Sequence, residues 1–486
     1  MKTKFNIALY LTAVLLLLSY SNSFAEVLRP FQILLPGNTC GNLITFNEDQ
    51  KAEGSEAFKL PYIVNDFFKQ KDKDSLIFAI GNDSDMFKAF SYLNKGKAER
   101  ELIKKCHPMA SALSPNDLEV YNEGYLDYDI KNRVFTNVEA PDNNEIFQRY
   151  FVTTINNSNV YFFNFITAEN CEKLALERWS QIRVDNPARA LRKINPDLTA
   201  KDFTISIVYG DLASVNELTD ELKRLKGIHF IVNVPINGES PLFPVTHLQD
   251  GNNNVFRFSV EPGYKALPIL NIIPKNVGYP RTTLRMIPFK KYSEKAIKND
   301  FKDVWNQVRQ EFHKPLKVIP ITNRPSTSAN RISLQAHAEM LKYATNTEIA
   351  FIKMPDQISF KESVITVGDV ITRFPNERII RFRATENQIR KMFSSMLEDS
   401  SIKDFGFAGC QFLALGKHFW EFSINRNSID KNRLYTISTT ELTAKEFAVQ
   451  KLLKSCIIEK YDGLTLWTVW KNNLQSFPAD EEKLFE

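Results

Sequence analysis

The sequence predicts a two-part protein, in which an amino-terminal α/β unit precedes a smaller α+β unit. From about residue 30 to 290, short apolar runs such as FQILL, SLIFAIG and FTISIVYG alternate with amphipathic stretches. Strands that alternate with helices are typical of a buried α/β sheet. After Pro315 the apolar runs and helical stretches restart in a different order, which indicates a second unit. The 486 residues, 43% of them hydrophobic, are enough for two or three domains with cores of their own.

Residues 1–25 have the pattern of a secretory signal peptide. Lys2 and Lys4 precede the apolar run FNIALYLTAVLLLL, and a small-residue cleavage site ends at Ala25. The apolar run is shorter than the ~20 residues that a membrane-spanning helix needs, and no later segment is comparably apolar. We therefore expect an exported protein, periplasmic or secreted, that is not an integral membrane protein.

Residues 26–291 form the predicted first domain. Its expected strands are the apolar runs FQILL, SLIFAIG, NVYFFNFI, FTISIVYG and GIHFIVNV. Between the last two lies ELTDELKRLKG, which has apolar residues at helical spacing and ends at Gly227. The repeated change from strand to helix favours a largely buried sheet.

Residues 292–314 are predicted to form a linker helix. The stretch YSEKAIKNDFKDVWNQVRQEFH is charged and amphipathic and has no partner strand beside it. The second domain, residues 315–486, begins with a loop rich in Pro, Ser, Thr and Asn. We expect helices over 332–344 and 386–397, with the apolar runs EIAFIK, VITVGDVI and RIIRFRAT between them.

Charge and cysteine content exclude some classes of protein. The formal net charge of +5 includes Lys2 and Lys4 of the signal, and the remaining charges of both signs are interspersed. This pattern does not indicate a nucleic-acid polymer as partner. Five cysteines are too few for a disulfide scaffold and odd in number, so at least one thiol is free or pairs between chains.

Five segments of the second domain carry a resemblance to a known family. In order, they are SLQAHAEMLKYATNTEIAFI, VITVGDVITRFP, RIIRFRATENQIRKMF, FGFAGCQF and SIDKNRLYTISTTELTA. Together they resemble the secreted two-domain 5′-nucleotidase family, which includes the periplasmic UDP-sugar hydrolases. The resemblance implies a 5′-nucleotidase C-terminal-like α+β domain here. Before it, the resemblance implies a metallophosphoesterase-like domain, which is a four-layer αββα sandwich with two metal ions bound at strand ends.

Five segments of the first domain are similar to the segments that carry the family's metal ligands, but the ligand residues differ. The segments are ILLPGNTCGNL, LIFAIGNDS, MASALSPNDLEVY, FTISIVYGDLAS and GIHFIVNVPIN. The resemblance implies that Asn38 stands at a ligand Asp, Cys40 at a ligand His and Asn82 at the bridging Asp. Pro115 stands at a ligand Asn, and Asn116 stands at the catalytic His. Three further ligand His positions hold Tyr209 (or Gly210), Pro235 and Asn237.

These side chains are chemically unsuited to a dimetal centre. Two divalent ions about 3.5 Å apart repel each other by roughly 19 kcal/mol at an effective dielectric of ~20, so anionic and imidazole ligands must offset that repulsion. Asn82 is neutral and cannot replace a bridging carboxylate. A lone Cys40 thiolate among amides is not a usual zinc or hard-metal site. We therefore expect no metal, no other cofactor and no catalytic residue.

Asp83 and Asp117 offer an alternative. Each lies one residue beyond a lost ligand, and a shifted loop would bring them inward as ligands of a reorganised site that holds a divalent metal. A structural interpretation is also open. Asp83 or Asp85 would be a helix N-cap, and Asp117 would belong to a Ser-Pro-Asn-Asp turn.

The family's substrate pocket is also altered. The stretch IKMPDQIS lacks the glycines and arginines that the resemblance places there to hold phosphate. At the positions of the two rings that sandwich the base, the sequence has approximately Asn376 and Leu442. Nearby aromatic residues are weak candidates for substrate contacts, and we favour a core role for each: Phe374, Phe412 and Phe447.

The sequence therefore predicts a non-catalytic binding or interaction protein of unknown ligand or partner. The alternative is a secreted, metal-dependent 5′-nucleotidase or phosphoesterase with a reorganised site. A third possibility is a sugar or peptide binder that uses the interdomain cleft.

In the family, rotation about the linker helix carries the pocket to the metals. Without either, we expect a fixed interdomain contact. For Cys40 we expect a buried free thiol or a local disulfide.

Overall fold

The structure is a computed structural model of the chain. It describes residues 29–46, 52–54, 56–69, 74–117, 132–139, 148–168, 170, 183–236, 240–250, 254–261, 266–275, 280–288, 302–318, 330–331, 334–353, 359–360, 364–398, 400–415, 418–424, 427–428, 430 and 433–475. The predicted signal peptide, residues 1–25, lies outside these ranges, as do Asn237 and Cys171. No helix in the described part of the chain combines the length and the apolar character that crossing a bilayer requires.

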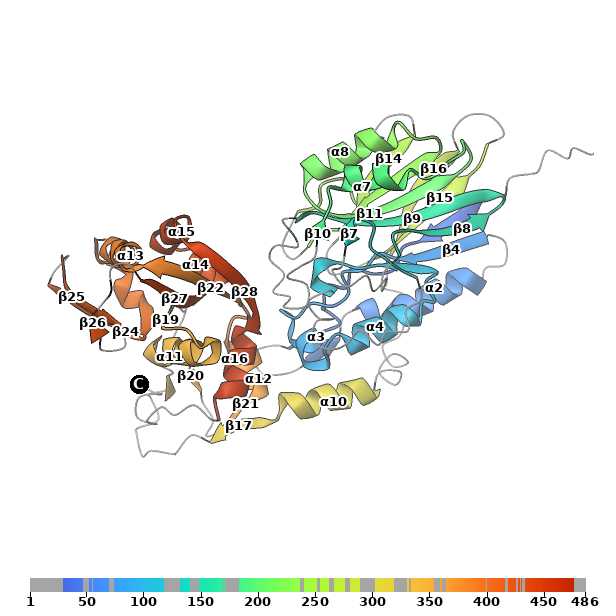
Figure 1. Ribbon diagram of the computed structural model, residues 1–486. Helices are drawn as coiled ribbons and strands as arrows, with labels where there is room; N and C mark the ends of the chain where they lie inside the picture. The colour runs from blue at the N-terminus through green and yellow to red at the C-terminus, as the bar shows by residue number, and fades with distance from the viewer. Residues whose placement is uncertain are drawn as a thin grey trace, which may run out of the picture.

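Two six-stranded sheets form the centre of the first domain (Figure 1). In order across the first sheet, the strands are β16 (Arg281–Pro288), β15 (Ala266–Ile273), β1 (Phe31–Leu34), β4 (Asp74–Ala79), β5 (Ala110–Ala112) and β6 (Arg133–Val134). In order across the second, they are β13 (Gln249–Asp250), β14 (Val255–Ser259), β12 (Ile228–Asn233), β11 (Phe203–Tyr209), β9 (Ser158–Ile166) and β8 (Phe151–Ile155).

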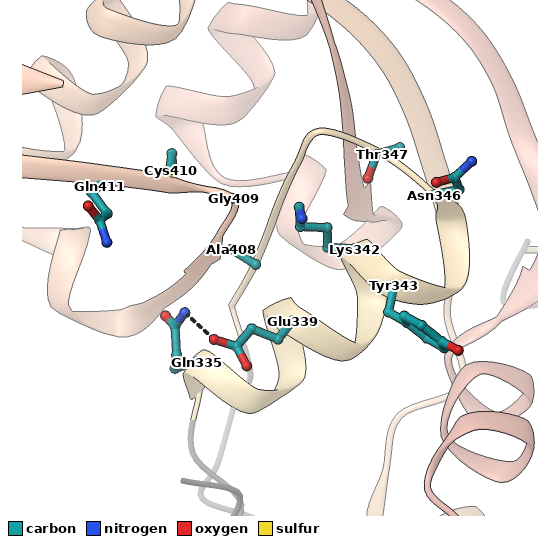
Figure 2. Close-up of a pocket in the computed structure, with 10 residues that line it drawn as sticks. All are labelled: Gln335, Glu339, Lys342, Tyr343, Asn346, Thr347, Ala408, Gly409, Cys410 and Gln411. Carbon is teal, nitrogen blue, oxygen red and sulfur yellow. Dashed lines mark hydrogen bonds between the residues drawn. The ribbon is translucent and has the colours of Figure 1, made fainter. Parts of the chain in front are cut away.

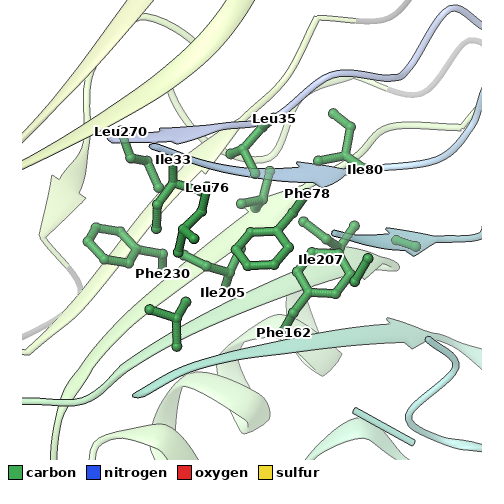
Figure 3. Close-up of a cluster of buried hydrophobic side chains, with 14 of the residues drawn as sticks. Ile33, Leu35, Leu76, Phe78, Ile80, Phe162, Ile205, Ile207, Phe230 and Leu270 are labelled. Atoms are coloured by element: carbon green, nitrogen blue, oxygen red, sulfur yellow. The ribbon is translucent and has the colours of Figure 1, made fainter. Parts of the chain in front are cut away.

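The main core of this domain lies between the two sheets (Figure 3). Ile33 and Phe78 of the first sheet meet Phe162 and Phe230 of the second in one buried cluster. The rings of Phe78 and Phe162 stack with their centroids 4.8 Å apart. Neighbouring residues on a strand point to opposite faces, so Leu34 joins a separate cluster on the outer face of the first sheet. Burial of both faces explains why these strands read as continuous apolar runs.

Helices cover the outer faces of both sheets. The first sheet is covered by α2 (Leu60–Lys69) and α4 (Lys97–Lys104), and the second by α7 (Pro187–Ile194) and α8 (Leu212–Leu222). The four-layer αββα sandwich that the resemblance implied is therefore confirmed.

The predicted linker helix is described in part. Helix α10 (Lys302–Phe312) buries Val308 and Phe312, and it leads into β17 (Pro315–Val318). Residues 289–301 lie outside the described residues, so the predicted beginning of this helix at 292 stays a prediction.

The second domain is built on a five-stranded sheet. In order, its strands are β23 (Phe405–Ala408), β19 (Ile349–Lys353), β27 (Leu434–Thr440), β22 (Arg378–Thr385) and β28 (Ile457–Thr465). One face packs against α11 (Leu334–Thr345), α12 (Val367–Arg373) and α16 (Leu466–Asn473). The other packs against α13 (Glu386–Glu398) and α15 (Phe447–Leu453). The predicted helices over 332–344 and 386–397 correspond to α11 and α13.

The run VITVGDVI is only partly a strand. It forms β21 (Val364–Thr366) and then turns into helix α12. The Thr366 hydroxyl accepts from the Asp369 N–H at 3.2 Å, and the Asp369 carboxylate accepts from the Thr366 N–H at 2.9 Å. This reciprocal capping box starts a helix inside an apolar run, where hydrophobicity alone does not separate the two structures.

Smaller elements complete the described chain. They are β2 (Ile44–Phe46), β3 (Ala52–Gly54), η1 (Glu56–Lys59), α3 (Ala89–Asn94), β7 (Val138–Glu139), β10 (Arg183–Val184), β18 (Asn330–Arg331), β20 (Ser359–Phe360), η3 (Ser401–Asp404), β24 (Cys410–Leu415), β25 (His418–Ile424), β26 (Asn427–Ser428) and α14 (Glu441–Ala444).

Candidate functional site

The candidate site lies where the parallel strands β1 and β4 end. Beyond the strands the two loops stay joined by backbone hydrogen bonds, from the Asn38 N–H to the Gly81 carbonyl (2.7 Å) and from the Cys40 N–H to the Asn82 carbonyl (2.8 Å). Asn38, Cys40 and Asn82 all have positive φ, at 64°, 51° and 57°. Asn tolerates this left-handed backbone better than most residues. The two loops are thus tightly turned, and this backbone shape brings the side chains of the three residues together.

Four of the predicted site residues form one buried hydrogen-bond network, which we call the amide network: Asn38, Cys40, Asn82 and Asn116. The Asn82 Nδ2 lies 2.7 Å from Asn38 Oδ1, 3.2 Å from Cys40 Sγ and 3.2 Å from the Pro235 carbonyl. Asn116 Nδ2 donates to Asn82 Oδ1 at 3.1 Å. These four positions, which the resemblance singled out, therefore lie together, and their polar atoms bind one another.

Asn38 and Cys40 make further hydrogen bonds. Asn38 Nδ2 donates to the Glu261 carbonyl at 2.6 Å, and the Cys40 thiol donates to Asn38 Oδ1 at 3.3 Å. Cys40 is a buried free thiol, which was one of the two states expected for it. Asn38 and Asn82 are each 0% exposed. Buried amides are stable in a protein when they are hydrogen-bonded in this way.

Tyr209 occupies the end of β11 beside the amide network. Its side chain is fully buried, and its hydroxyl donates to the Ile80 carbonyl. A Cβ built on Gly81 would lie 2.7 Å from the Tyr209 Oη, so the ring fills the space against that glycine. Burial raises the pKa of Tyr209 well above its usual value, and the nearby Asp117 and Asp83 add to the shift. Tyr209 is thus a neutral, structural hydrogen-bond donor.

Asp117 is a structural residue of the turn that the sequence indicated. Its Oδ1 accepts from the N–H groups of Asp83 (3.0 Å) and Ser84 (2.9 Å). Its Oδ2 accepts from the Asn82 N–H (2.7 Å) and from both the N–H and the hydroxyl of Ser114 (2.9 Å each). Burial raises the pKa of Asp117, and these hydrogen bonds oppose the shift. Both carboxylate oxygens are therefore engaged in holding the Asn82 loop.

Asp83 is buried against the opposite loop. Its Oδ1 lies 3.5 Å from the Thr39 N–H, and its carbonyl accepts from the Thr39 hydroxyl at 2.7 Å. Burial raises the pKa of Asp83 well above its usual value, and the charges of Asp117 and Glu99 add to the shift. The suggested N-cap role for Asp83 or Asp85 was wrong, because α3 begins after Lys88 with no side-chain cap. Asp85 Oδ1 instead accepts from the Phe87 N–H in the preceding turn.

The residues do not fit the dimetal centre that the fold implies. Within the described ranges, no group of three or more His, Cys, Asp or Glu side chains is arranged to hold a metal ion. The amide network offers neutral oxygens and one thiol, and its amide hydrogens are directed at the same atoms that a metal would need. Pro235 contributes only a carbonyl. No step of a metal-dependent reaction can be derived from this arrangement.

The three aromatic candidates for substrate contacts do not lie together. Phe374 is buried among His337 and Trp470, with centroids 5.4 and 4.9 Å away, on one face of the second domain's sheet. Phe412 packs against the core on the other face. Phe447 is 71% exposed at the start of α15. Phe374 therefore lies in the core, Phe412 is partly buried against it, and the expected core role is wrong for Phe447.

The structure shows a separate hollow of about 630 Å³ on the second domain, which the sequence did not indicate (Figure 2). It lies between α11 and the turn from β23 to β24. Gln335 and Glu339 are hydrogen-bonded to each other at 3.0 Å on its α11 side, while Lys342 crosses toward Gly409. Cys410 also lines it, and burial raises the pKa of this thiol to about 12. None of the predicted site residues lines this hollow.

Comparison with known proteins supports the fold. No family model matches the sequence, and no curated protein matches it. A Staphylococcus aureus protein assigned as a 5′-nucleotidase superposes with a TM-score of 0.61 at 10% identity, over 92% of this chain and 97% of that one. The NAD nucleotidase of Haemophilus influenzae gives 0.55 at 14% identity, over 92% and 96%.

The 5′-nucleotidase precursor of Thermus thermophilus gives a TM-score of 0.53 at 13% identity, over 92% of this chain and 96% of that one. The chain thus has the two-domain 5′-nucleotidase fold over nearly its whole length. At these identities the likeness shows the fold alone, and it says nothing about the residues at the site.

Proposed function

We propose that this protein is a non-catalytic member of the 5′-nucleotidase fold that serves as a binding or interaction protein. The observation that carries this proposal is the contact between Asn82 Nδ2 and Asn38 Oδ1, at 2.7 Å. In the register of the resemblance, these two positions hold metal ligands. Here one side chain donates a hydrogen bond to the other, so the atoms that should bind cations bind each other.

The chemistry of each position supports the same proposal. A dimetal centre needs anionic ligands, but Asn38, Asn82 and Asn116 are neutral. Asn116 stands at the position of a catalytic histidine, and an amide cannot take up or release a proton near neutral pH as an imidazole does. Binding a cation would also break the hydrogen bonds of the amide network, each of which contributes about 1 kcal/mol to stability.

The alternative, a metal-dependent phosphoesterase with a reorganised site, would use Asp83 and Asp117 as ligands. The two oxygens of Asp117 already accept hydrogen bonds from the N–H groups of Asn82, Asp83 and Ser84 and from both the N–H and the hydroxyl of Ser114. Moving this carboxylate to a metal would leave those buried N–H groups without partners, which costs about 1–3 kcal/mol for each group. The geometry therefore favours the non-catalytic proposal.

An activity assay tests the proposal. The purified protein is incubated with AMP and with a generic phosphodiester, bis(4-nitrophenyl) phosphate, in buffers that contain manganese, zinc or cobalt. We expect no phosphate or nitrophenol release above that of buffer alone. Metal-dependent turnover that is abolished in Asp83→Ala or Asp117→Ala would instead establish the reorganised site.

Export is a further part of the proposal. The positively charged start, the apolar run and the cleavage site ending at Ala25 support a periplasmic or secreted location. Mass spectrometry of the protein purified from the producing cell would test it, since we expect a mature chain that begins at Glu26. An intact Met1 terminus in the cytoplasmic fraction would contradict it.

A further inference from the structure

The segment 86–95, which directly follows the Asn82 loop, contacts the second domain as well as neighbouring elements of the first. It contains a short turn and helix α3, which packs beside α10 near the second domain (Figure 1). Sequence reasoning assigned a role only to the residues before it, since Asp83 or Asp85 was expected to cap its helix. We call residues 86–95 the docking segment.

The first contact of the docking segment is with the start of β22. Asn376 Nδ2 donates to the Met86 carbonyl at 2.8 Å, and the Arg378 guanidinium lies over the Phe87 ring, 4.8 Å from its centroid. Asn376 stands near the position where the resemblance placed a ring for substrate. The amide here contacts the first domain instead.

The second contact is between Tyr92 and α16. The Tyr92 hydroxyl lies 3.2 Å from the Thr468 hydroxyl, and its ring meets Trp467 edge-on with centroids 5.5 Å apart. The Lys471 ammonium lies 5.6 Å from the centre of the same ring. Lys471 also pairs with Glu311 of α10 at 2.8 Å, so α3, α10 and α16 are joined through one side chain.

An apolar core runs across the same boundary. Phe312 at the end of α10 belongs to the core of the second domain and stacks on Phe46 of the first domain, with centroids 4.3 Å apart. A Cβ added to Gly368 of α12 would lie 2.4 Å from the Phe312 ring, so the helix lies directly on it. Leu93 of the docking segment packs against the same core. Interfaces with a continuous apolar core resist relative domain motion.

We propose that the docking segment is an internal interaction surface whose partner is the chain's own second domain, and that it holds the two domains in one arrangement. Hydrogen bonds, two cation–π contacts and a shared core all act across this boundary, and a rotation of one domain would break them together. The domain rotation that the resemblance implies therefore does not occur in this protein. This inference does not depend on whether a metal binds.

Distance measurement between the domains tests the inference. In a background with Cys171, Cys410 and Cys456 replaced by Ser, spin labels are attached at Leu212→Cys on α8 and Leu413→Cys on β24, which are 48% and 55% exposed. Pulsed electron paramagnetic resonance then gives the distribution of distances. We expect a single narrow distribution for this parent protein. A broad or bimodal distribution would overturn the proposal.

Variants then test the role of the docking segment. Tyr92→Ala combined with Arg378→Ala should broaden the distribution at least twofold, while circular dichroism verifies that both domains stay folded. Tyr343→Ala is the matched control, because this tyrosine is 53% exposed on α11 at the separate hollow. An unchanged narrow distribution in the double variant would overturn the assignment to residues 86–95. The distance distribution of the parent protein tests the proposal by itself, so the proposal can be overturned even if the double variant does not fold.

Discussion

Asn82 and Asn116, 34 residues apart in the chain, meet at 3.1 Å, with the Asn116 amide donating to Asn82 Oδ1. The Asn82 amide in turn donates to Asn38, so both ends of one side chain are occupied by the neighbours that would otherwise surround a cation. The amide network is thus a self-contained polar core at the ends of β1 and β4. Such a network stabilises a fold only when every member is satisfied, which makes its members sensitive to single substitutions.

Asn82→Asp should destabilise the protein and should not create a metal site. The substitution removes the donor to Asn38 and Cys40 and places a carboxylate beside Asp117 and Asp83, both buried. We expect the free energy of unfolding to fall by about 2–4 kcal/mol at pH 8. Urea unfolding followed by tryptophan fluorescence measures it.

Asn346→Asp is the control for this substitution. Asn346 is exposed and has a φ of 50°, close to the 57° of Asn82, so backbone strain is matched while burial differs. We expect this variant to change stability by less than about 0.5 kcal/mol. Equal losses in the two variants would contradict the view that the buried network is the cause.

Asp117→Ala should unfold the turn that holds the Asn82 loop. The change leaves the N–H groups of Asn82, Asp83 and Ser84 without their acceptor. A loss of about 3 kcal/mol or more in the free energy of unfolding is expected. Asp211→Ala removes the exposed N-cap of α8 and should cost only about 1 kcal/mol. A loss for Asp117→Ala no larger than that of Asp211→Ala would argue against its clamping role.

Glu99 should make stability fall as pH rises. It is 0% exposed on α4. Burial raises its pKa from 4.5 to about 7, although the charge of the adjacent Arg100 opposes the shift. The folded state therefore binds the proton more tightly than the unfolded state, and its stabilising effect is full below pH 4.5 and is lost as pH rises through 7.

Glu99→Gln tests this pH dependence. The advantage of the variant over the native protein should grow from pH 5 to pH 8 and reach about 3 kcal/mol, the equivalent of the pKa shift. The two proteins must be compared at each pH because two buried histidines add a pH dependence of opposite sign. Burial lowers the pKa of His229 to about 4 and of His337 to about 3, so the protein loses stability as the pH falls below 6.5. A pH-independent difference would contradict the assignment.

Cys40 should resist alkylation in the folded protein. Its side chain is 4% exposed, and its sulfur lies within the amide network, whereas Cys410 and Cys456 are half-buried. Iodoacetamide at neutral pH, followed by peptide mass mapping, should modify Cys40 only after urea unfolding. Rapid modification in the native state would identify an accessible thiol and would revive the amide network as a candidate chemical site.

The strands and the larger helices were predictable because their signals are local. FQILL and FTISIVYG became β1 and β11, since strands that are buried on both faces must be apolar at every position. The helix α12 was missed because a capping box, and not hydrophobic periodicity, begins it after Thr366. The beginning of α3 was misplaced for a related reason. The Asp85 carboxylate accepts a hydrogen bond from the Phe87 N–H in a local turn and does not cap the helix, which begins after Lys88.

The site residues were predictable from the resemblance, but their bonding was not. Motif spacing placed Asn38, Cys40 and Asn82 at the ends of neighbouring strands. Nothing in the sequence shows that the amide of Asn82 donates to the other two side chains, because that depends on loop shape and on positive φ at all three residues. The contact of Asn376 with Met86 joins positions 290 residues apart and has no local signal at all.

Metal content tests the central claim most directly. The purified protein is equilibrated with manganese, zinc or cobalt, passed through a desalting column to remove free ions, and measured by elemental analysis against protein concentration. With the amide network in place of anionic ligands, we expect less than about 0.2 equivalents of any of these metals per chain. Retention of about two equivalents, lost in Asp83→Ala, would contradict the account and would show that the dimetal centre persists with different ligands.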